Sequence, residues 1–193
     1  DHLPSLFPLL TNASSSSDIP ILQNILTSAL KGIKDPSLQS KELLNTYRTA
    51  DAGQQPNYYR VMAALGSADL LTELAGSFNQ TGGSAKIAMA KAMGEWKDGA
   101  ALHTLFNLAR KNPAGDLGST LVNAFTRQLA VSKNSSENKY LMIRDIMPLA
   151  SDSRQKTALL NALGRISTYP SLLYTAGFLK DPELKKAAAN AIM

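Results

Sequence analysis

The sequence predicts an all-α protein made of antiparallel helix pairs that stack side by side. Apolar residues recur at three- and four-residue steps along most of the chain, which places them on one face of a helix. The 12 glycines and 9 prolines fall mostly between these periodic segments, where helices begin and end. Ala and Leu, the strongest helix formers, supply much of the 44% hydrophobic content, so the 193 residues can bury a core without disulfides.

Residues 1–17 are predicted to be an N-terminal extension, because they end in a run of serines at positions 14–17 that is typical of an exposed loop. Residues 18–193 are predicted to form a single helical repeat domain. The last helix ends at Met193 without a glycine, a proline or a polar cap, and no later helix follows to cover Ala187, Ala188 and Ile192. We therefore expect the chain to be a fragment of a longer protein.

The first helix pair of this domain is marked by periodicity and by its breaks. One apolar stripe consists of Leu22, Ile25, Leu26, Ala29, Leu30 and Ile33. Asp35 then offers a capping oxygen and Pro36 a preset backbone angle, which together favour the start of a second helix. The same Asp-Pro device returns at Asp181 and Pro182, which is a first indication of repetition.

Short endings of alanine plus an apolar residue give stronger evidence of repetition. Their second residues follow one another at intervals of 28 to 38 residues, and each ending precedes a turn and another periodic helix. The endings are Ala64-Leu65, Ala92-Met93, Ala124-Phe125, Ala162-Leu163 and Ala191-Ile192. A helix–turn–helix unit that recurs at such a period predicts a solenoid.

The segment from Phe178 to Ile192 resembles a junction of the HEAT and armadillo-like repeat family, in which one helix ends at Leu-x-Asp-Pro and the next is rich in alanine. A weaker version runs from Asp152 to Gly164, and the resemblance covers the chain from about Ser17 onward. It implies a right-handed α-solenoid, a superhelix of antiparallel helix pairs. The intervals are shorter than the ~40–47 residues of HEAT units, and the unit around Ala124 departs from the pattern.

In such stacks the second helix of each pair lines the concave face, which is the usual binding surface. Polar residues at three- and four-residue steps on these helices are therefore the candidate binding surface: Asp69, Glu73, His103, Asn107, Arg110 and Lys180. These residues mix charge signs and include no aromatic anchor, so a plain solvated face is the competing interpretation.

Residues with catalytic, cofactor-binding or metal-binding spacing are not found in the sequence. There is no cysteine, and the two histidines, His2 and His103, have no ligand-spaced carboxylate beside them. Gly82-Gly83-Ser84 is interpreted as a link in which Ser84 caps the next helix, with anion binding as the alternative. Trp96 is interpreted as a packing residue.

We therefore expect a non-catalytic module that binds a protein partner or a neighbouring domain of the same chain, or acts as a structural spacer. The family resemblance implies a part of a larger bacterial protein, in which a sugar-acting or other catalytic domain lies elsewhere. The alternative is a nucleic-acid-binding enzyme of the DNA glycosylase type that uses Trp96 and Asp98. A carbohydrate-binding module is a third option, but the sequence lacks the aromatic platform that such modules need.

The net charge of +5 is spread along the chain, which argues against nucleic acid, and no segment is long and apolar enough for a membrane span. The absence of cysteine fits both the cytoplasm and a bacterial periplasm or cell surface. We favour the periplasm or cell surface.

Overall fold

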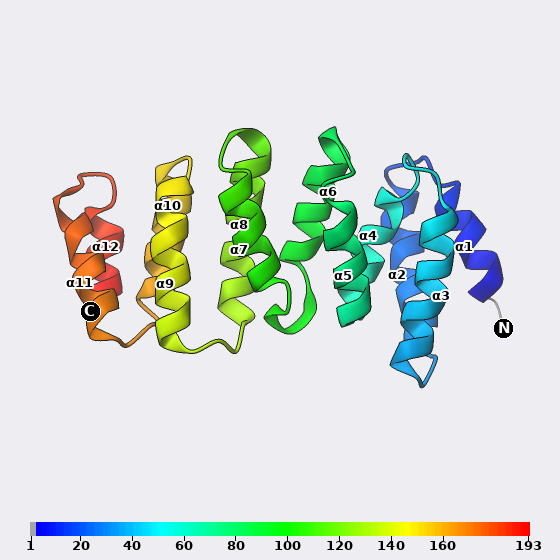
Figure 1. Cartoon of the computed structure of the whole chain (residues 1–193), viewed down its shortest axis with the longest axis horizontal. Coiled ribbons are helices and arrows are strands. Elements are labelled where there is room, and N and C mark those ends of the chain that lie inside the picture. Colours follow the sequence, from blue (N-terminus) through cyan, green and yellow to red (C-terminus); the bar gives the residue numbers. More distant parts are fainter. Residues whose placement is uncertain (1–2) are drawn as a thin grey trace. The chain divides into compact units, whose positions relative to one another are not determined.

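The computed structural model describes residues 3–193, and all regular elements in this range are helical (Figure 1). The prediction of an all-α fold is confirmed. The chain divides into two compact units, Asp1–Lys97 and Asp98–Met193, which we call unit 1 and unit 2. The short 3-10 helix η1, Lys97–Gly99, lies at the division, and within it Asp98 and Gly99 both have positive φ angles of 59° and 71°. These angles interrupt the right-handed helical path between α6 and α7.

Unit 1 contains six α-helices that form two rows of contacts. In one row α2 contacts α4 and α4 contacts α6, and in the other α3 contacts α5, while α1 covers α2 and α4. The helices are α1 (Leu3–Thr11), α2 (Asp18–Lys31), α3 (Pro36–Thr49), α4 (Pro56–Leu65), α5 (Ala68–Ser77) and α6 (Gly83–Gly94).

Unit 2 repeats this alternation. Helix α8 contacts α10 and α10 contacts α12 in one row, whereas α7 contacts α9 in the other. The elements are α7 (Leu102–Lys111), α8 (Gly115–Val131), α9 (Ser136–Ile146), η2 (Met147–Leu149), α10 (Ser153–Leu163), α11 (Tyr169–Ala176), η3 (Gly177–Lys180) and α12 (Lys185–Ile192).

Side-chain caps explain where several of these helices begin. Asp35 accepts a hydrogen bond from the Ser37 N–H at the start of α3, as the sequence predicts. Ser67 caps α5 and Asp152 caps α10 in the same way. Each cap satisfies one N–H group that the first helical turn leaves without a partner, so these residues define the helix starts locally.

Residues 3–11, inside the predicted N-terminal extension, form helix α1, whose Phe7 and Leu10 are buried. Two sequence expectations about the helices are wrong. Ala124-Phe125 lies inside α8 and is not a helix end, since no glycine follows it to stop the helix. Ile25 of the expected α2 stripe is exposed, and Gln23 is buried instead with its side-chain amide donating to the Asn57 carbonyl at 2.8 Å.

One further boundary differs from the prediction. Helix α6 starts at Gly83 with Gly82 as its N-cap, so Ser84 already lies in the first turn. Helix α9 begins at Ser136, because the Ser135 hydroxyl caps it by accepting from the Asn138 N–H.

The C-terminal helices pack more completely than the sequence suggests. Ala187 and Ala188 of α12 are buried and Ile192 is half-buried, because α12 packs against α10, α11 and η3. The expectation that the two alanines lack cover is therefore wrong. At this contact a Cβ on Gly164 would lie 2.9 Å from the Cα of Ala191, so α10 and α12 approach closely only because residue 164 has no side chain.

Helix α11 buries polar residues and exposes apolar ones. Its buried residues are Ser171 and Thr175, whereas Tyr169, Leu172 and Leu173 are exposed at 74%, 44% and 53%. The buried hydroxyls are satisfied locally, because Ser171 donates to the Ile166 carbonyl at 2.7 Å and Thr175 donates to the Ser171 carbonyl at 2.8 Å. The apolar side of α11 therefore faces away from the core of unit 2.

Candidate functional site

A polar groove between α3 and α5 is the main concave feature of unit 1 that carries charged side chains. It has a volume of about 650 Å³ and is open to solvent. It is lined by Ser37, Ser40, Lys41, Leu44, Asn45, Arg48, Asp69, Thr72, Glu73, Gly76, Ser77 and Gln80. Two of the predicted surface residues, Asp69 and Glu73, line this groove.

Helical spacing places these side chains on two facing walls. On α3 the lining positions 37, 41, 45 and 48 recur at steps of three and four, opposite to the buried face that contains Leu43 and Tyr47. On α5 positions 69, 72, 73, 76 and 77 do the same, opposite to Leu70 and Leu74. The amphipathic pattern that buries each helix also creates the walls of the groove.

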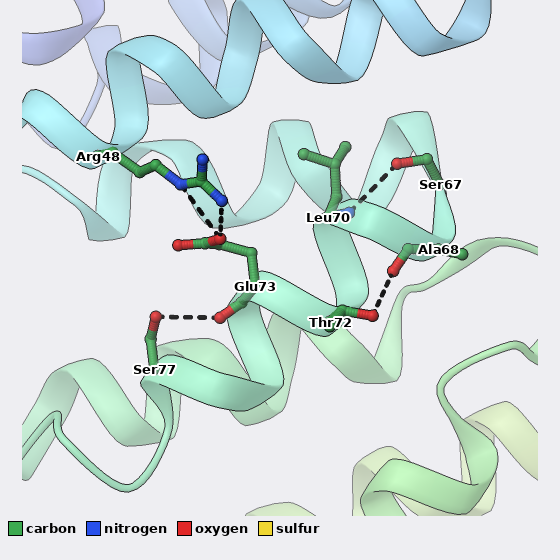
Figure 2. Close-up of polar contacts among 7 residues, drawn as sticks. All are labelled: Arg48, Ser67, Ala68, Leu70, Thr72, Glu73 and Ser77. Atoms are coloured by element: carbon green, nitrogen blue, oxygen red, sulfur yellow. Dashed lines mark hydrogen bonds and ion pairs between the residues drawn. The ribbon is translucent and has the colours of Figure 1, made fainter.

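Two direct contacts join the walls. The Ser40 and Ser67 hydroxyls are 2.8 Å apart, and the Arg48 guanidinium donates to Oε2 of Glu73 from Nε at 3.2 Å and from Nη2 at 2.5 Å. Figure 2 shows Arg48 reaching from α3 to Glu73 on α5. Both residue numbers increase from the first contact to the second, so α3 and α5 run in the same direction along the groove.

The hydroxyl groups of the α5 wall are held by the helix itself. Thr72 donates to the Ala68 carbonyl at 2.9 Å and Ser77 donates to the Glu73 carbonyl at 3.0 Å, as Figure 2 shows. The Ser67 hydroxyl accepts from the Leu70 N–H at 3.3 Å. These bonds hold the side chains in place. The Thr72 and Ser77 hydroxyls keep both lone pairs available to accept hydrogen bonds from a ligand, whereas Ser67 already accepts from the Leu70 N–H and the Ser40 hydroxyl.

Two buried tyrosines lie beneath this surface. The hydroxyls of Tyr47 and Tyr59 make no hydrogen bond among residues 3–193, and the two rings pack with their centroids 6.2 Å apart. Burial raises the pKa of both phenols, and the nearby negative charge of Glu73 adds to the rise for Tyr47. Both phenols therefore stay neutral to a higher pH than an exposed tyrosine does.

The other predicted surface residues lie in unit 2. His103, Asn107 and Arg110 share one exposed face of α7, as their spacing predicts. There His103 Nε2 lies 3.2 Å from the Asn134 amide nitrogen, and the Arg110 guanidinium lies over the Phe106 ring at 5.2 Å from its centroid. Lys180 is exposed on η3 and not on α11. Lys180 lines a shallow depression formed by residues 177, 178 and 180–183, which includes no residue of α7.

The chemistry of the groove is that of recognition by hydrogen bonds and charge. Its lining contains no histidine, and the charges at its walls are two cations and two carboxylates. Across residues 3–193 no group of three or more histidine, aspartate and glutamate side chains gathers in a way that holds a metal ion. Within the same range, none of the helices has the length and apolar character needed to cross a bilayer. His2 lies outside the described residues.

Sequence reasoning missed the α3 wall. The signal was present, because Ser37, Lys41, Asn45 and Arg48 follow the same polar spacing as the residues chosen on α5. Only the fold shows that this stripe faces Asp69 and Glu73 across a groove.

Comparison of the chain with family models, with curated proteins and with solved structures finds no match in any of the three. The groove between α3 and α5 is therefore identified as the candidate site by its own geometry.

Proposed function

We propose that the chain is a non-catalytic helical-repeat module of the HEAT-like kind, a right-handed solenoid that binds a segment of a partner protein in the groove between α3 and α5. The observation that carries this proposal is the groove itself, whose two walls come from successive second helices and are lined almost entirely by polar side chains. A structural spacer needs no such concavity.

The alternation of contacts within each unit supports the repeat architecture. In unit 1 the row α2, α4, α6 backs the row α3, α5, and unit 2 repeats this order with α8, α10, α12 behind α7, α9. Each hairpin buries its apolar face against the next hairpin, which is the arrangement that a solenoid requires. Handedness and membership of the HEAT family are part of the proposal.

The composition of the groove favours a polypeptide over nucleic acid. Lys41 and Arg48 are balanced by Asp69 and Glu73, so a phosphate backbone gains little net attraction there. Trp96 is 2% exposed and therefore has no face on which a base can stack. The DNA glycosylase alternative accordingly has no support from these residues, whereas hydroxyl and amide groups such as those of Thr72 and Asn45 suit the hydrogen-bonding groups of a peptide.

The proposal is tested by filling the groove. A random dodecapeptide library displayed on phage is selected against the whole chain, and the selected peptides are measured by fluorescence anisotropy. Gly76→Trp is the blocking variant, because Gly76 lines the groove on α5 and a Cβ there meets nothing within 4 Å. Replacing a helix-interior glycine also favours helix formation, so the variant is expected to fold.

We expect Gly76→Trp to weaken peptide binding at least about tenfold, since each lost 1.4 kcal/mol is a factor of ten. Gly53→Trp is the matched control: it adds the same side chain in open space in the turn between α3 and α4, outside the groove. Equal affinity of the wild type, the blocked variant and the control for every selected peptide would refute the proposal.

A further inference from the structure

The charges in the groove are sorted by helix. Both cations, Lys41 and Arg48, come from α3, and both carboxylates, Asp69 and Glu73, come from α5. Because α3 and α5 run in the same direction, the groove has one basic wall and one acidic wall along its length. This separation gives the groove an electrostatic direction from wall to wall.

Only one of the two pairs of opposite charges across the groove forms an ion pair, and we call it the closed pair. Arg48 and Glu73 form the ion pair described above, with side chains 58% and 22% exposed. Lys41 and Asp69 are both exposed and make no hydrogen bond or ion pair within residues 3–193. Lys41 directly follows Ser40 and Asp69 lies two residues after Ser67, so both stand near the Ser40–Ser67 contact. That end of the groove therefore presents an open cation opposite an open carboxylate.

The closed pair also retains binding capacity. Nε and Nη2 of Arg48 both donate to the same Glu73 oxygen, so the Nη1 group of Arg48 still has two N–H donors available. A ligand carboxylate can therefore reach Arg48 without displacing Glu73. Both cations of the basic wall are in this sense accessible to an acidic side chain.

An extended polypeptide is the ligand whose geometry fits two oppositely charged walls. Successive side chains of an extended chain point to opposite sides, so a segment lying along the groove turns alternate residues toward α3 and toward α5. Side chains on one edge recur every ~7 Å. Asp69 and Glu73 are four residues apart on α5, or ~6 Å of rise, which is close to one repeat. Lys41 and Arg48 are seven residues apart on α3, or ~10.5 Å of rise, which lies between one and two repeats and is bridged by the long side chains of the two cations.

Resting on the proposed function, we propose that the groove binds an extended partner segment in which acidic and basic side chains alternate, with the acidic edge on Lys41 and Arg48 and the basic edge on Asp69 and Glu73. A uniformly acidic segment places carboxylates against Asp69 and Glu73, and a uniformly basic segment places cations against Lys41 and Arg48. Each is disfavoured by repulsion between like charges, which makes the charge order of the partner the basis of selectivity.

Two synthetic probes of identical composition test this proposal. One is an octapeptide in which lysine and glutamate alternate, and the other has its four lysines and four glutamates in separate blocks. Binding to the whole chain is measured by fluorescence anisotropy at low ionic strength, where screening is weak. We expect the alternating peptide to bind about tenfold more tightly than the block peptide, because only the alternating one places a single charge type on each edge.

Matched charge reversals locate the effect. Lys41→Glu makes both walls acidic at the open end and is expected to weaken the alternating peptide about tenfold. Arg60→Glu makes the same change of charge on an exposed residue of α4 outside the groove, and is expected to leave binding within about twofold, since its charge is distant and screened. Equal affinity for the two peptides, no binding of either, or equal effects of the two reversals overturns the proposal.

This outcome is separate from a failure of the proposed function. If library-selected peptides lose affinity in Gly76→Trp while the alternating octapeptide has no advantage, the groove binds peptides by another chemistry and only the charge-order proposal fails. If no selected peptide depends on Gly76, the proposed function itself fails.

Discussion

At the scale of single residues, the buried tyrosine hydroxyls are the clearest departure from an ordinary helical core. Tyr47 and Tyr59 are 1% and 2% exposed, and neither hydroxyl has a hydrogen-bond partner among residues 3–193. Burial of a polar group without a partner costs free energy, and it also favours the neutral phenol over the phenolate. The pKa of Tyr59 is therefore raised above the ordinary value of 10.0, with burial as the largest cause.

The raised pKa predicts a loss of stability in alkaline solution. Above pH 10 the unfolded chain releases the Tyr59 proton while the folded chain keeps it, so the free energy of unfolding falls as the pH rises from 10 toward the folded-state pKa. Below pH 10 this contribution is fully present. We expect the free energy of unfolding of Tyr59→Phe to fall less than that of the wild type between pH 9 and pH 10.8. Urea unfolding is the measurement.

The same variant removes the hydroxyl that lacks a partner, so at pH 8 it should be as stable as the wild type or more stable by about 1 kcal/mol. Leu74→Ala, a core substitution without a titrating group, is the control for general alkaline weakening. Parallel pH profiles of the wild type and Tyr59→Phe would show that Tyr59 titrates normally.

At the scale of helices, α10 and α11 bury opposite kinds of residue. Helix α10 buries Leu159, Leu160 and Leu163, whereas α11 turns Leu172 and Leu173 outward and keeps Ser171 and Thr175 inside. The two helices should therefore respond differently to the same truncation. Leu160→Ala leaves a cavity and is expected to cost about 2–5 kcal/mol. Leu173→Ala removes an exposed side chain and is expected to change the free energy of unfolding by less than about 0.5 kcal/mol.

Urea unfolding of the two leucine variants checks this expectation. A cost for Leu173→Ala comparable to that of Leu160→Ala would mean that another surface covers α11 in solution.

Periodicity and turn chemistry predicted most helices correctly, but they predicted less well which face of each helix is buried. The Asp35 cap and the endings at Leu65, Leu163 and Ile192 all mark true helix boundaries. Ile25 is exposed, whereas the side chain of Gln23 is buried and donates a hydrogen bond to the backbone carbonyl of Asn57, 34 residues away. Such a bond leaves no local signal. For the same reason the sequence pointed to Asp69 and Glu73 on α5 but not to the facing residues of α3. The packing of α3 beside α5 is a tertiary contact that no local pattern shows.

At the scale of the whole molecule, the chain consists of two units, each with its own buried core. Leu70, Leu74 and Phe78 belong to the core of unit 1, and Leu121 and Phe125 belong to that of unit 2. Proteins open in roughly contiguous cooperative units, so local stability depends on the contacts within each unit. A core truncation should therefore act mainly within its own unit.

Amide hydrogen exchange followed by mass spectrometry tests this independence. Leu74→Ala is expected to speed exchange in α3 to α6 by lowering the local opening free energy by about 2–5 kcal/mol, while α8 to α12 change little. Leu121→Ala should produce the reverse pattern. If either substitution accelerates both units equally, the chain opens as one cooperative body.

The contact between Gly164 and Ala191 gives the recurring alanine-plus-apolar endings a physical meaning. Ala162-Leu163 and Ala191-Ile192 are two of those endings, and the backbones beside them meet where residue 164 has no side chain. At these two endings the signature therefore marks a place where the backbones of α10 and α12 lie close together. A methyl group at residue 164 would separate the two backbones, so even a change to alanine is expected to loosen the packing of α12.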